Sequence, residues 1–471
     1  ARGLKVILYM TDDPQWHNET GVESLDSAAY SAYKGRSIDL TTRDGFGEFS
    51  YDNFFEVMQN YPDLAGFWID NDNAYWETHN LYGQIRQIRP TWLLSNNNEN
   101  TPIMDTVSHE QKTGMTPDYD YAAATWVPLP QKQEADFKLA GGWWYNGTNP
   151  VVDRRLSIGR YMSTAGSSIN ALIAEGAQHG GRFPSELESF NNFIDGYLDQ
   201  IWESIGGTEG GGYMYGGLQP GSAPNGAFLY TTISKADPNI HYIHVITRPS
   251  GSTLSLRDSG YKVTAVTNLR TGASMNFSQG NGSLTITGIS SWDSYDTVFR
   301  VVTAGKLFVY PQSSMIATAS ASASGHPAPS LVDGNYSTYW DSNTTVPVSI
   351  TFDLGSPKKV ASIGINQTEW SVSYARSATE DSARIKGYSI FVSNDGTNWG
   401  SAIKTGTLES ARGIRFIDVN VPSTRFIRLT VNSTWAASTA TNFYRKLRID
   451  EMYVFSDFVS SSTPTPTWTP T

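Results

Sequence analysis

The chain has 471 residues, 39% of them hydrophobic, and a formal net charge of −11. This length suggests about three domains with real cores. The acidic balance, without a long basic run, argues against a nucleic-acid partner, because phosphate binding needs clustered Lys and Arg. No stretch approaches the roughly 20 consecutive apolar residues of a membrane-spanning helix. The opening residues ARGLKVILYMTDD read as the interior of a domain and not as a signal peptide.

Cysteine is absent, which excludes disulfides, Cys-ligated zinc and thiol nucleophiles. Aromatic residues are abundant, with 14 Trp and 25 Tyr. Carbohydrate-active proteins use aromatic faces as platforms for sugar rings. Large cores and surface Tyr would account for the same composition, so composition alone favours neither interpretation.

The N-terminal region, residues 1–215, alternates apolar runs with stretches of helical spacing. Strands are predicted at LKVILYM (Leu4–Met10), LAGFWI (Leu64–Ile69) and TWLLSNN (Thr91–Asn97). Helices are predicted at YDNFFEVMQNY (Tyr51–Tyr61), at LYGQIRQIRP (Leu81–Pro90) and, around a short strand-like centre, within 154–176 and 185–205. Such alternation predicts a parallel sheet, either open or closed into a (β/α)8-type barrel.

The pattern changes after the glycine-rich segment Gly206–Gly217. Residues 218–304 show short alternating runs between turn signals, which predict a small antiparallel β domain. Residues 313–457 are again all β and have the length of one β-sandwich. The Thr/Pro-rich tail, residues 458–471, predicts an extended linker, and we expect further modules beyond it.

An apolar run ends in Asp70 within LAGFWIDNDNAYW, with aromatic residues on both sides. In a parallel barrel, functional side chains lie where strands end. Cleaving a glycosidic bond typically needs two carboxylates, so a partner for Asp70 would come from a neighbouring strand end or loop. The loop expected after the third strand offers Asp105, His109 and Glu110, and Glu134 follows further on. Solvated surface acids remain the alternative interpretation of Asp70 and Glu110.

The order of these motifs resembles the retaining α-L-fucosidases of glycoside hydrolase family 29, across most of residues 1–215. The matching residues are Gly3, Leu4, Tyr9, Trp16 and His17, then Trp68, Ile69 and Asp70, then Ile85, Arg86 and Pro90, then Glu110, and finally Trp143, Trp144, Tyr145 and Asn146. The small β domain fits the C-terminal domain of that family.

The resemblance implies that Asp70 is the nucleophile and Glu110 the acid/base, with Glu134 as the main rival. It implies no cofactor for catalysis. The residues expected to contact substrate are Trp16, His17, Trp68, Trp143, Trp144 and Glu134. Packing is the alternative role for Trp16, His17, Trp143 and Trp144.

Several positions depart from the family pattern. Asn71 stands where the family usually has Gly after the nucleophile, and SNNNEN lacks the Arg of the family's Asn-Arg pair. The family's Lys-His-His-Asp-Gly-Phe segment would precede Ala1, so the first strands of the barrel are expected to be missing. These departures leave the sugar open, and a glycosidase of related fold that acts on another sugar is an alternative.

Residues 313–457 resemble the discoidin, or F5/8 type C, domain, which in bacteria includes the family 32 carbohydrate-binding modules. The matching stretches are Leu331–Ser342, Ile350–Ile365, Gly387–Trp399, Thr424–Val431 and Ile449–Phe455. The resemblance implies a structural calcium ion held by Asp333, Thr338, Glu451 and carbonyl oxygens. A turn cap at Asp333 and a surface position for Glu451 are the alternative. The expected sugar-binding residues are Trp370, Arg376 and Trp435.

The sequence therefore predicts a multidomain, secreted bacterial exo-glycosidase with a retaining mechanism and an appended carbohydrate-binding module. Its substrates would be α-L-fucosides or a related terminal sugar, and its partners fucosylated or galactose-containing glycans. The alternative is a non-catalytic glycan-binding or adhesin protein with a degenerate barrel.

Overall fold

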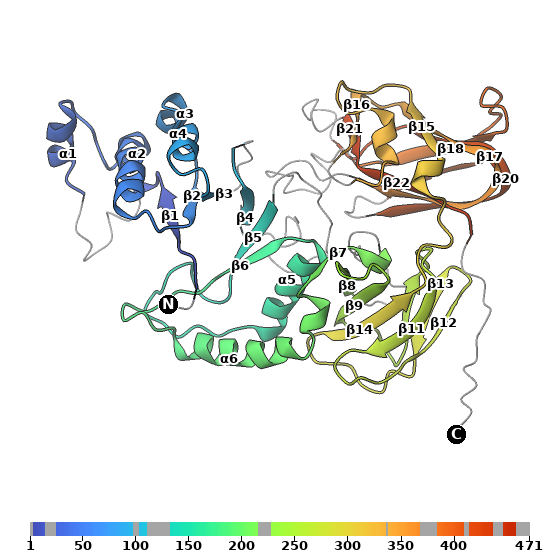
Figure 1. Ribbon diagram of the computed structural model, residues 1–471, viewed down its shortest axis with the longest axis horizontal. Coiled ribbons are helices and arrows are strands. Elements are labelled where there is room, and N and C mark those ends of the chain that lie inside the picture. The colour runs from blue at the N-terminus through green and yellow to red at the C-terminus, as the bar shows by residue number, and fades with distance from the viewer. Residues whose placement is uncertain are drawn as a thin grey trace. The chain divides into compact units, whose positions relative to one another are not determined.

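The computed structural model of the chain is shown in Figure 1. It describes residues 3–14, 25–97, 103–110, 132–214, 228–335, 338–367, 384–408, 414–436 and 446–457. These residues divide into two compact units, one up to Glu110 together with 132–134 and one from Ala135 onward. No described helix is long and apolar enough to cross a membrane.

The first unit contains a parallel sheet whose strands follow one another in chain order. The strands are β1 (Ile7–Thr11), β2 (Gly66–Asp70), β3 (Leu93–Asn97) and β4 (Thr106–Glu110). Each pairs in parallel with the next. The N–H of Lys132, the first residue of β5 (Lys132–Lys138), donates to the carbonyl of Asp105 at 3.3 Å. The predicted parallel sheet is confirmed, and its closure into a barrel stays a prediction.

The helices of this unit are coloured blue in Figure 1 and follow β1 and β2 along the chain. They are α1 (Ser27–Lys34), α2 (Arg43–Asn60), α3 (Ala74–Thr78) and α4 (Leu81–Ile88). Phe54 of α2, Phe67 of β2 and Trp76 of α3 are fully buried, and the Phe54 ring meets the other two edge to face. Burying a large apolar side chain stabilises a fold by about 1.5–3 kcal/mol. This core holds helices and sheet together beneath the strand ends.

The segment Thr106–Glu110 differs from the sequence expectation of a loop, because it forms strand β4. Its sequence, TVSHE, contains one apolar residue, so it lacks the continuous apolar run by which buried parallel strands are recognised. Polar pairing takes the place of that run. The Thr106 hydroxyl donates to Ser95 Oγ at 2.7 Å, and both side chains are buried.

In the second unit, the Leu139 N–H donates to the Ala174 carbonyl at 3.0 Å, which joins the end of β5 to β6 (Asn170–Ala174). Helices α5 (Arg154–Gly166) and α6 (Ser185–Asp199) flank β6 along the chain, as expected. Apolar residues of α5 and α6 pack against an antiparallel sheet. Members of this cluster are Ile158, Met162, Tyr197, Tyr230, Tyr242 and Val298.

The antiparallel domain has two sheets, in the orders β11-β14-β9-β8-β7 and β10-β13-β12. Its strands are β7 (Thr208–Gly210), β8 (Phe228–Ser234), β9 (Ile240–Thr247), β10 (Leu254–Arg257), β11 (Val263–Asn268), β12 (Asn276–Gly280), β13 (Ser283–Thr287) and β14 (Thr297–Thr303). Since β7 pairs with β8, the sheet begins before residue 218, within the glycine-rich segment.

The C-terminal part is a β-sandwich, drawn in orange and red in Figure 1. Its strands are β15 (Ile316–Ala319), β16 (Trp340–Thr345), β17 (Val348–Asn366), β18 (Gly387–Ser393), β19 (Lys404–Thr407), β20 (Arg415–Val431), β21 (Lys446–Ile449) and β22 (Glu451–Phe455). The larger sheet runs β15-β17-β20-β18-β19, with β22 also on β17, and β16 pairs with β21. A C-terminal sandwich is confirmed, its bounds at 313–457 stay a prediction, and the predicted linker 458–471 lies outside the described residues.

Candidate functional site

Three neighbouring parallel strands of the first unit end in polar residues. Asp70, Asn97 and Glu110 are the last residues of β2, β3 and β4. Because the strands lie in register, with Ile69 opposite Asn96 and Asn97 opposite Ser108, the three ends meet at one edge of the sheet. This carboxyl edge is where barrel enzymes place functional side chains.

The side chain of Asn97 connects the two carboxylates. Its Nδ2 donates to Asp70 Oδ1 at 3.0 Å and to Glu110 Oε2 at 3.2 Å. The two carboxylate oxygens are therefore no more than about 6 Å apart, the sum of the two distances. Asn97 is only 7% exposed, so its amide is held within the protein. Asp70 and Glu110, both predicted from the sequence, are thus brought together by a third residue.

Tyr9 supplies a second donor to Asp70. Its hydroxyl donates to Asp70 Oδ2 at 2.7 Å, so both oxygens of this carboxylate accept hydrogen bonds. Burial, together with the neighbouring Asp70 carboxylate, raises the pKa of the Tyr9 phenol well above its ordinary value. Tyr9 therefore keeps its proton at neutral pH and remains a hydrogen-bond donor.

Trp68 and Glu134 belong to the same group of side chains. Residues two apart on a strand share a face, so Trp68 lies on the same side of β2 as Asp70. The Trp68 indole N–H donates to Glu134 Oε1 at 2.9 Å. The Trp68 ring stacks on Tyr9, with ring centroids 5.6 Å apart and an interplanar angle of 19°. Of the predicted site residues, the structure gathers Asp70, Glu110, Trp68 and Glu134.

The backbone after Asp70 explains one departure from the fucosidase pattern. Asn71 has φ 68°, in the left-handed region that favours Gly and that Asn tolerates best among other residues. Its carbonyl accepts a hydrogen bond from Asn96 Nδ2 at 3.1 Å. Asn71 can therefore take the conformation for which a Gly is usual. The next residue, Asp72, accepts the Tyr82 hydroxyl at 2.9 Å.

Asp105, a candidate partner for Asp70, has a different role. Its carboxylate forms an ion pair with Arg86 and accepts the Leu94 N–H at 2.8 Å. It precedes β4, whereas Glu110 ends it. Asp105 therefore lies at the amino end of the strand and supports the fold there. His109 lies in β4, but its side chain is outside what the structure describes.

The remaining predicted substrate residues are not placed at this site. Trp16 and His17 lie outside the described residues. Trp143 and Trp144 belong to the second unit. Trp143 is half-buried with the Lys138 ammonium 5.5 Å from its ring centroid, and Trp144 is 54% exposed. Their contact with substrate stays a prediction.

Two residues of the site were missed as site residues by sequence reasoning. Tyr9 was noted only as part of a matching motif, and Asn97 only as part of a segment that departs from the family. The available signal was position. Asn97 is the last residue of a predicted strand next to the strand that ends in Asp70, and neighbouring parallel strands end at the same edge.

The expected calcium ligands in the sandwich are partly brought together. The Thr338 hydroxyl donates to Asp333 Oδ2 at 2.7 Å. Glu451 is fully buried, and burial, with the nearby Asp333 and Asp450 carboxylates, raises its pKa to about 9. Its Oε1 is buried without a hydrogen-bond partner among the described residues. Carboxylate and hydroxyl oxygens around a buried, under-satisfied acid fit a hard cation such as Ca²⁺. No group of three or more His, Cys, Asp or Glu side chains arranged for a metal occurs in the described part of the chain.

Among the expected sugar-binding residues of the sandwich, Trp370 and Arg376 lie outside the described residues. The indole N–H of Trp435 donates to the Leu408 carbonyl at 3.0 Å, and the Lys386 ammonium lies 4.4 Å from a ring centroid of Trp435. A cation beside this aromatic ring is in keeping with the predicted platform, but sugar binding by Trp435 stays a prediction.

Comparison with known proteins bears on both parts of the chain. The model of the F5/8 type C domain matches residues 316–444. A family 32 carbohydrate-binding module from Clostridium perfringens NanJ, solved with galactose, is 24% identical with a TM-score of 0.26, over 31% of this chain and 98% of the module. An α-L-fucosidase isoenzyme from Paenibacillus thiaminolyticus is 17% identical with a TM-score of 0.46, over 64% of this chain and 73% of that one.

The α-fucosidase from Thermotoga maritima is 16% identical with a TM-score of 0.46, over 64% of this chain and 65% of that one. Residues 316–444 of this chain thus match the model of the F5/8 type C domain, and the solved structures similar to the chain include family 32 carbohydrate-binding modules and α-L-fucosidases.

Proposed function

We propose that the chain is a retaining glycoside hydrolase in which Asp70 is the nucleophile and Glu110 the general acid and base. One observation carries the proposal, namely that a single amide nitrogen of Asn97 lies 3.0 Å from Asp70 and 3.2 Å from Glu110. This limits the separation of the two oxygens to about 6 Å. Retaining pairs stand about 5–5.5 Å apart, whereas inverting pairs stand about 6.5–9.5 Å apart.

The hydrogen bonds suit this division of roles. Hydrogen bonds to a carboxylate stabilise its charged form. Asp70 accepts one from Tyr9 and one from Asn97, which suits an ionised nucleophile. Glu110 accepts the second hydrogen bond of Asn97 and would carry the proton that the leaving group needs.

The reaction would proceed in two steps. An oxygen of Asp70 bonds to the anomeric carbon while the glycosidic bond breaks, and Glu110 gives its proton to the departing oxygen. Water then attacks the anomeric carbon, gives a proton to Glu110 and releases Asp70. The stacked rings of Tyr9 and Trp68 would form an apolar wall beside the sugar. Glu134, held by Trp68, is the second candidate for the acid.

We propose α-L-fucosides, or glycosides of a related terminal sugar, as substrates. The ordered motifs shared with the fucosidases support this choice. The F5/8 type C domain would bind carbohydrate and keep the enzyme on glycans outside the cell, with a calcium ion held by Asp333, Thr338 and Glu451. The calcium would be structural, since its ligands belong to the sandwich and none of them to the strands that carry Asp70 and Glu110.

The test is hydrolysis of a panel of aryl glycosides, α-L-fucoside included, by the full chain and by Asp70→Asn. Asp72→Asn is the matched control, because this acid lies two residues away and is bonded to Tyr82. Turnover lost in Asp70→Asn and kept in Asp72→Asn would support the proposal, whichever sugar is cleaved. Glycan binding by a folded protein that hydrolyses none of the panel would favour the adhesin alternative.

A further inference from the structure

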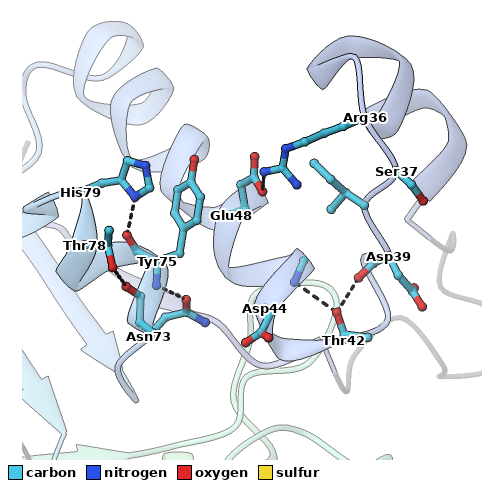
Figure 2. A pocket seen from close by; sticks show the side chains of 13 residues that line it. Arg36, Ser37, Asp39, Thr42, Asp44, Glu48, Asn73, Tyr75, Thr78 and His79 are labelled. Carbon is cyan, nitrogen blue, oxygen red and sulfur yellow. Dashed lines mark hydrogen bonds and ion pairs between the residues drawn. The ribbon is translucent and has the colours of Figure 1, made fainter.

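A pocket lies in the first unit, and neither Asp70 nor Glu110 lines it. It has a volume of about 480 Å³, within the range of roughly 300–1,000 Å³ typical of small-molecule sites. Figure 2 shows its arrangement. Tyr75 and His79 form one wall, Arg36 and the segment after it form the other, and the first turns of α2, with Asp44, lie between them.

Two glycines of α2 hold both walls close to this helix. A Cβ atom on Gly45 would lie 2.1 Å from the Asp39 carbonyl oxygen, and one on Gly47 would lie 2.3 Å from Asn73 Nδ2. Glycine destabilises a helix, so the two glycines in the first turns of α2 lower the stability of this helix. They permit a close approach that larger residues would prevent. The pocket is therefore preformed by direct packing of its walls on the helix.

One wall carries an ordered aromatic pair. The rings of Tyr75 and His79 stack with centroids 3.9 Å apart and an angle of 21°. His79 Nδ1 is 2.8 Å from the Tyr75 carbonyl, which fixes the orientation of the imidazole. Tyr51 meets both rings edge to face from within the unit. Flat, fixed aromatic surfaces of this kind suit the apolar face of a sugar ring.

The polar groups of the pocket select against anions. Glu48 is buried and forms ion pairs with Arg36 and Lys34, and Lys34 also pairs with Asp52, so these two acids and two bases balance in charge. Asp44 is exposed and has no hydrogen-bond or ion-pair partner among the described residues. Asp39, also exposed, lies across the pocket from the aromatic pair. Carboxylates accept hydrogen bonds from sugar hydroxyls but repel acidic sugars.

The pocket is connected to the proposed active site through Asn73. This residue lines the pocket and follows Asp70 by three positions in the chain. Its Nδ2 donates to Asp12 Oδ2 at 3.0 Å, and Asp12 directly follows the end of β1. The pocket is therefore lined by the segment between α1 and α2, by the first turns of α2 and by α3, and the hydrogen bond from Asn73 to Asp12 joins it to the carboxyl end of β1.

We propose that this pocket is a second carbohydrate site, which binds a neutral sugar unit of the glycan that carries the scissile residue. The inference rests on the proposed function for its substrate class. Stacking on the Tyr75–His79 pair and hydrogen bonds to Asp44 would give it selectivity for neutral over acidic sugars. The site would favour oligosaccharides over simple aryl glycosides.

The experiment follows the imidazole NMR signal of His79 in the full chain, assigned by its loss in His79→Gln. Lactose and N-acetyllactosamine are the neutral probes, glucuronic acid is the acidic probe and an alkylamine is the cationic probe. A neutral probe is expected to shift the His79 signal until the site is saturated. The affinity of this probe should fall about tenfold or more in Asp44→Asn, since a hydrogen bond to a charged group is lost. Asp63→Asn, an exposed acid outside the pocket, is the matched control and leaves the affinity unchanged.

Three outcomes would overturn the proposal. They are no His79 shift with either neutral sugar, an equal shift in Asp44→Asn, and a shift with the alkylamine alone, which would make the pocket a cation site. The readout needs no turnover, so it separates this inference from the proposed function. Binding without hydrolysis of any glycoside would leave the pocket standing and remove the enzyme. Hydrolysis of a glycoside without a His79 shift would support the enzyme and overturn the proposal of a second carbohydrate site.

Discussion

Asn97 donates to Glu110 across two neighbouring strands, at 3.2 Å, while the same nitrogen donates to Asp70 at 3.0 Å. One amide group thus sets the distance between two carboxylates that belong to different strands. An amide is suited to this position because it can donate both its protons without adding a charge. A carboxylate in its place would repel both neighbours.

Replacement of Asn97 tests this arrangement. We expect Asn97→Ala to lower kcat/KM by about 10- to 100-fold, through loss of hydrogen bonds to charged groups. Asn97→Asp should lower it further, because a third carboxylate would lie about 3 Å from the other two and its charge would repel ionised Asp70. Asn60→Asp, an exposed site at the end of α2, is the control. Steady-state kinetics on the best glycoside of the panel provide the measurement, and equal losses in Asn97→Ala and Asn97→Asp would argue against two adjacent carboxylates in the working enzyme.

The dependence of the reaction rate on the leaving group distinguishes Glu110 from Glu134 as the general acid. General acid catalysis contributes about 10²- to 10⁴-fold, and a good leaving group needs little of it. We expect Glu110→Gln to lose most of its turnover on an alkyl glycoside and little of its first step on a dinitrophenyl glycoside. Glu134→Gln should lose both to a similar, smaller extent, since it replaces the charged acceptor of the Trp68 indole N–H with a neutral amide oxygen. The reverse pattern would assign the acid role to Glu134.

We expect the second unit to lose stability in acid because of the buried residue His241. It is fully buried in β9, and burial lowers its pKa to about 4. The unfolded chain has an ordinary His pKa of about 6.5 and takes up a proton first, so stability is full above pH 6.5 and falls as the pH drops towards 4. The difference amounts to at most about 3 kcal/mol.

Thermal unfolding followed between neutral and acid pH measures this effect. The unfolding temperature of His241→Gln should depend less on pH than that of the parent chain over this window. His79→Gln, which replaces an exposed His, should keep the parent dependence. An identical pH dependence in His241→Gln and the parent chain would show that other groups control acid stability.

Calcium is expected to stabilise the sandwich through Glu451. Without a cation, burial raises the pKa of Glu451 to about 9, so the folded chain keeps a proton that the unfolded chain loses above about pH 4.5. The free energy of unfolding therefore falls as the pH rises from about 4.5 towards 9. Calcium would displace that proton. At a hundredfold excess over its Kd it would add about 2.7 kcal/mol.

The measurement compares unfolding temperatures with calcium and with a chelator, at neutral and alkaline pH. The calcium-dependent rise should be larger at alkaline pH and absent in Glu451→Gln. Glu188→Gln, an exposed acid of α6, should retain it. A parent chain whose unfolding temperature ignores calcium at every pH would remove the metal site from the proposal.

Much of the fold was predictable because its signals are local. Phe67–Ile69 and Trp92–Leu94 are continuous apolar runs, and α4 ends before Pro90, so strand, helix and their alternation follow from neighbouring residues. Strand β4 was not predictable in this way. Its buried polar residues are satisfied by partners on β3, such as Ser95 for Thr106, and these pairs exist only once the strands are in register.

By itself, the sequence determined that an acid, Asp70, ends an apolar run, and that residues 313–457 resemble an F5/8 type C domain, because both depend on local patterns. Only the tertiary structure decided which residues meet Asp70. Tyr9, Asn97 and Glu110 come from three other strands, and strand register places Tyr9 and Asn97 within hydrogen-bonding reach of Asp70, and Glu110 within reach of Asn97. The number of residues between two strands does not predict that register, because the register is set by pairing across the sheet and by the core beneath the sheet.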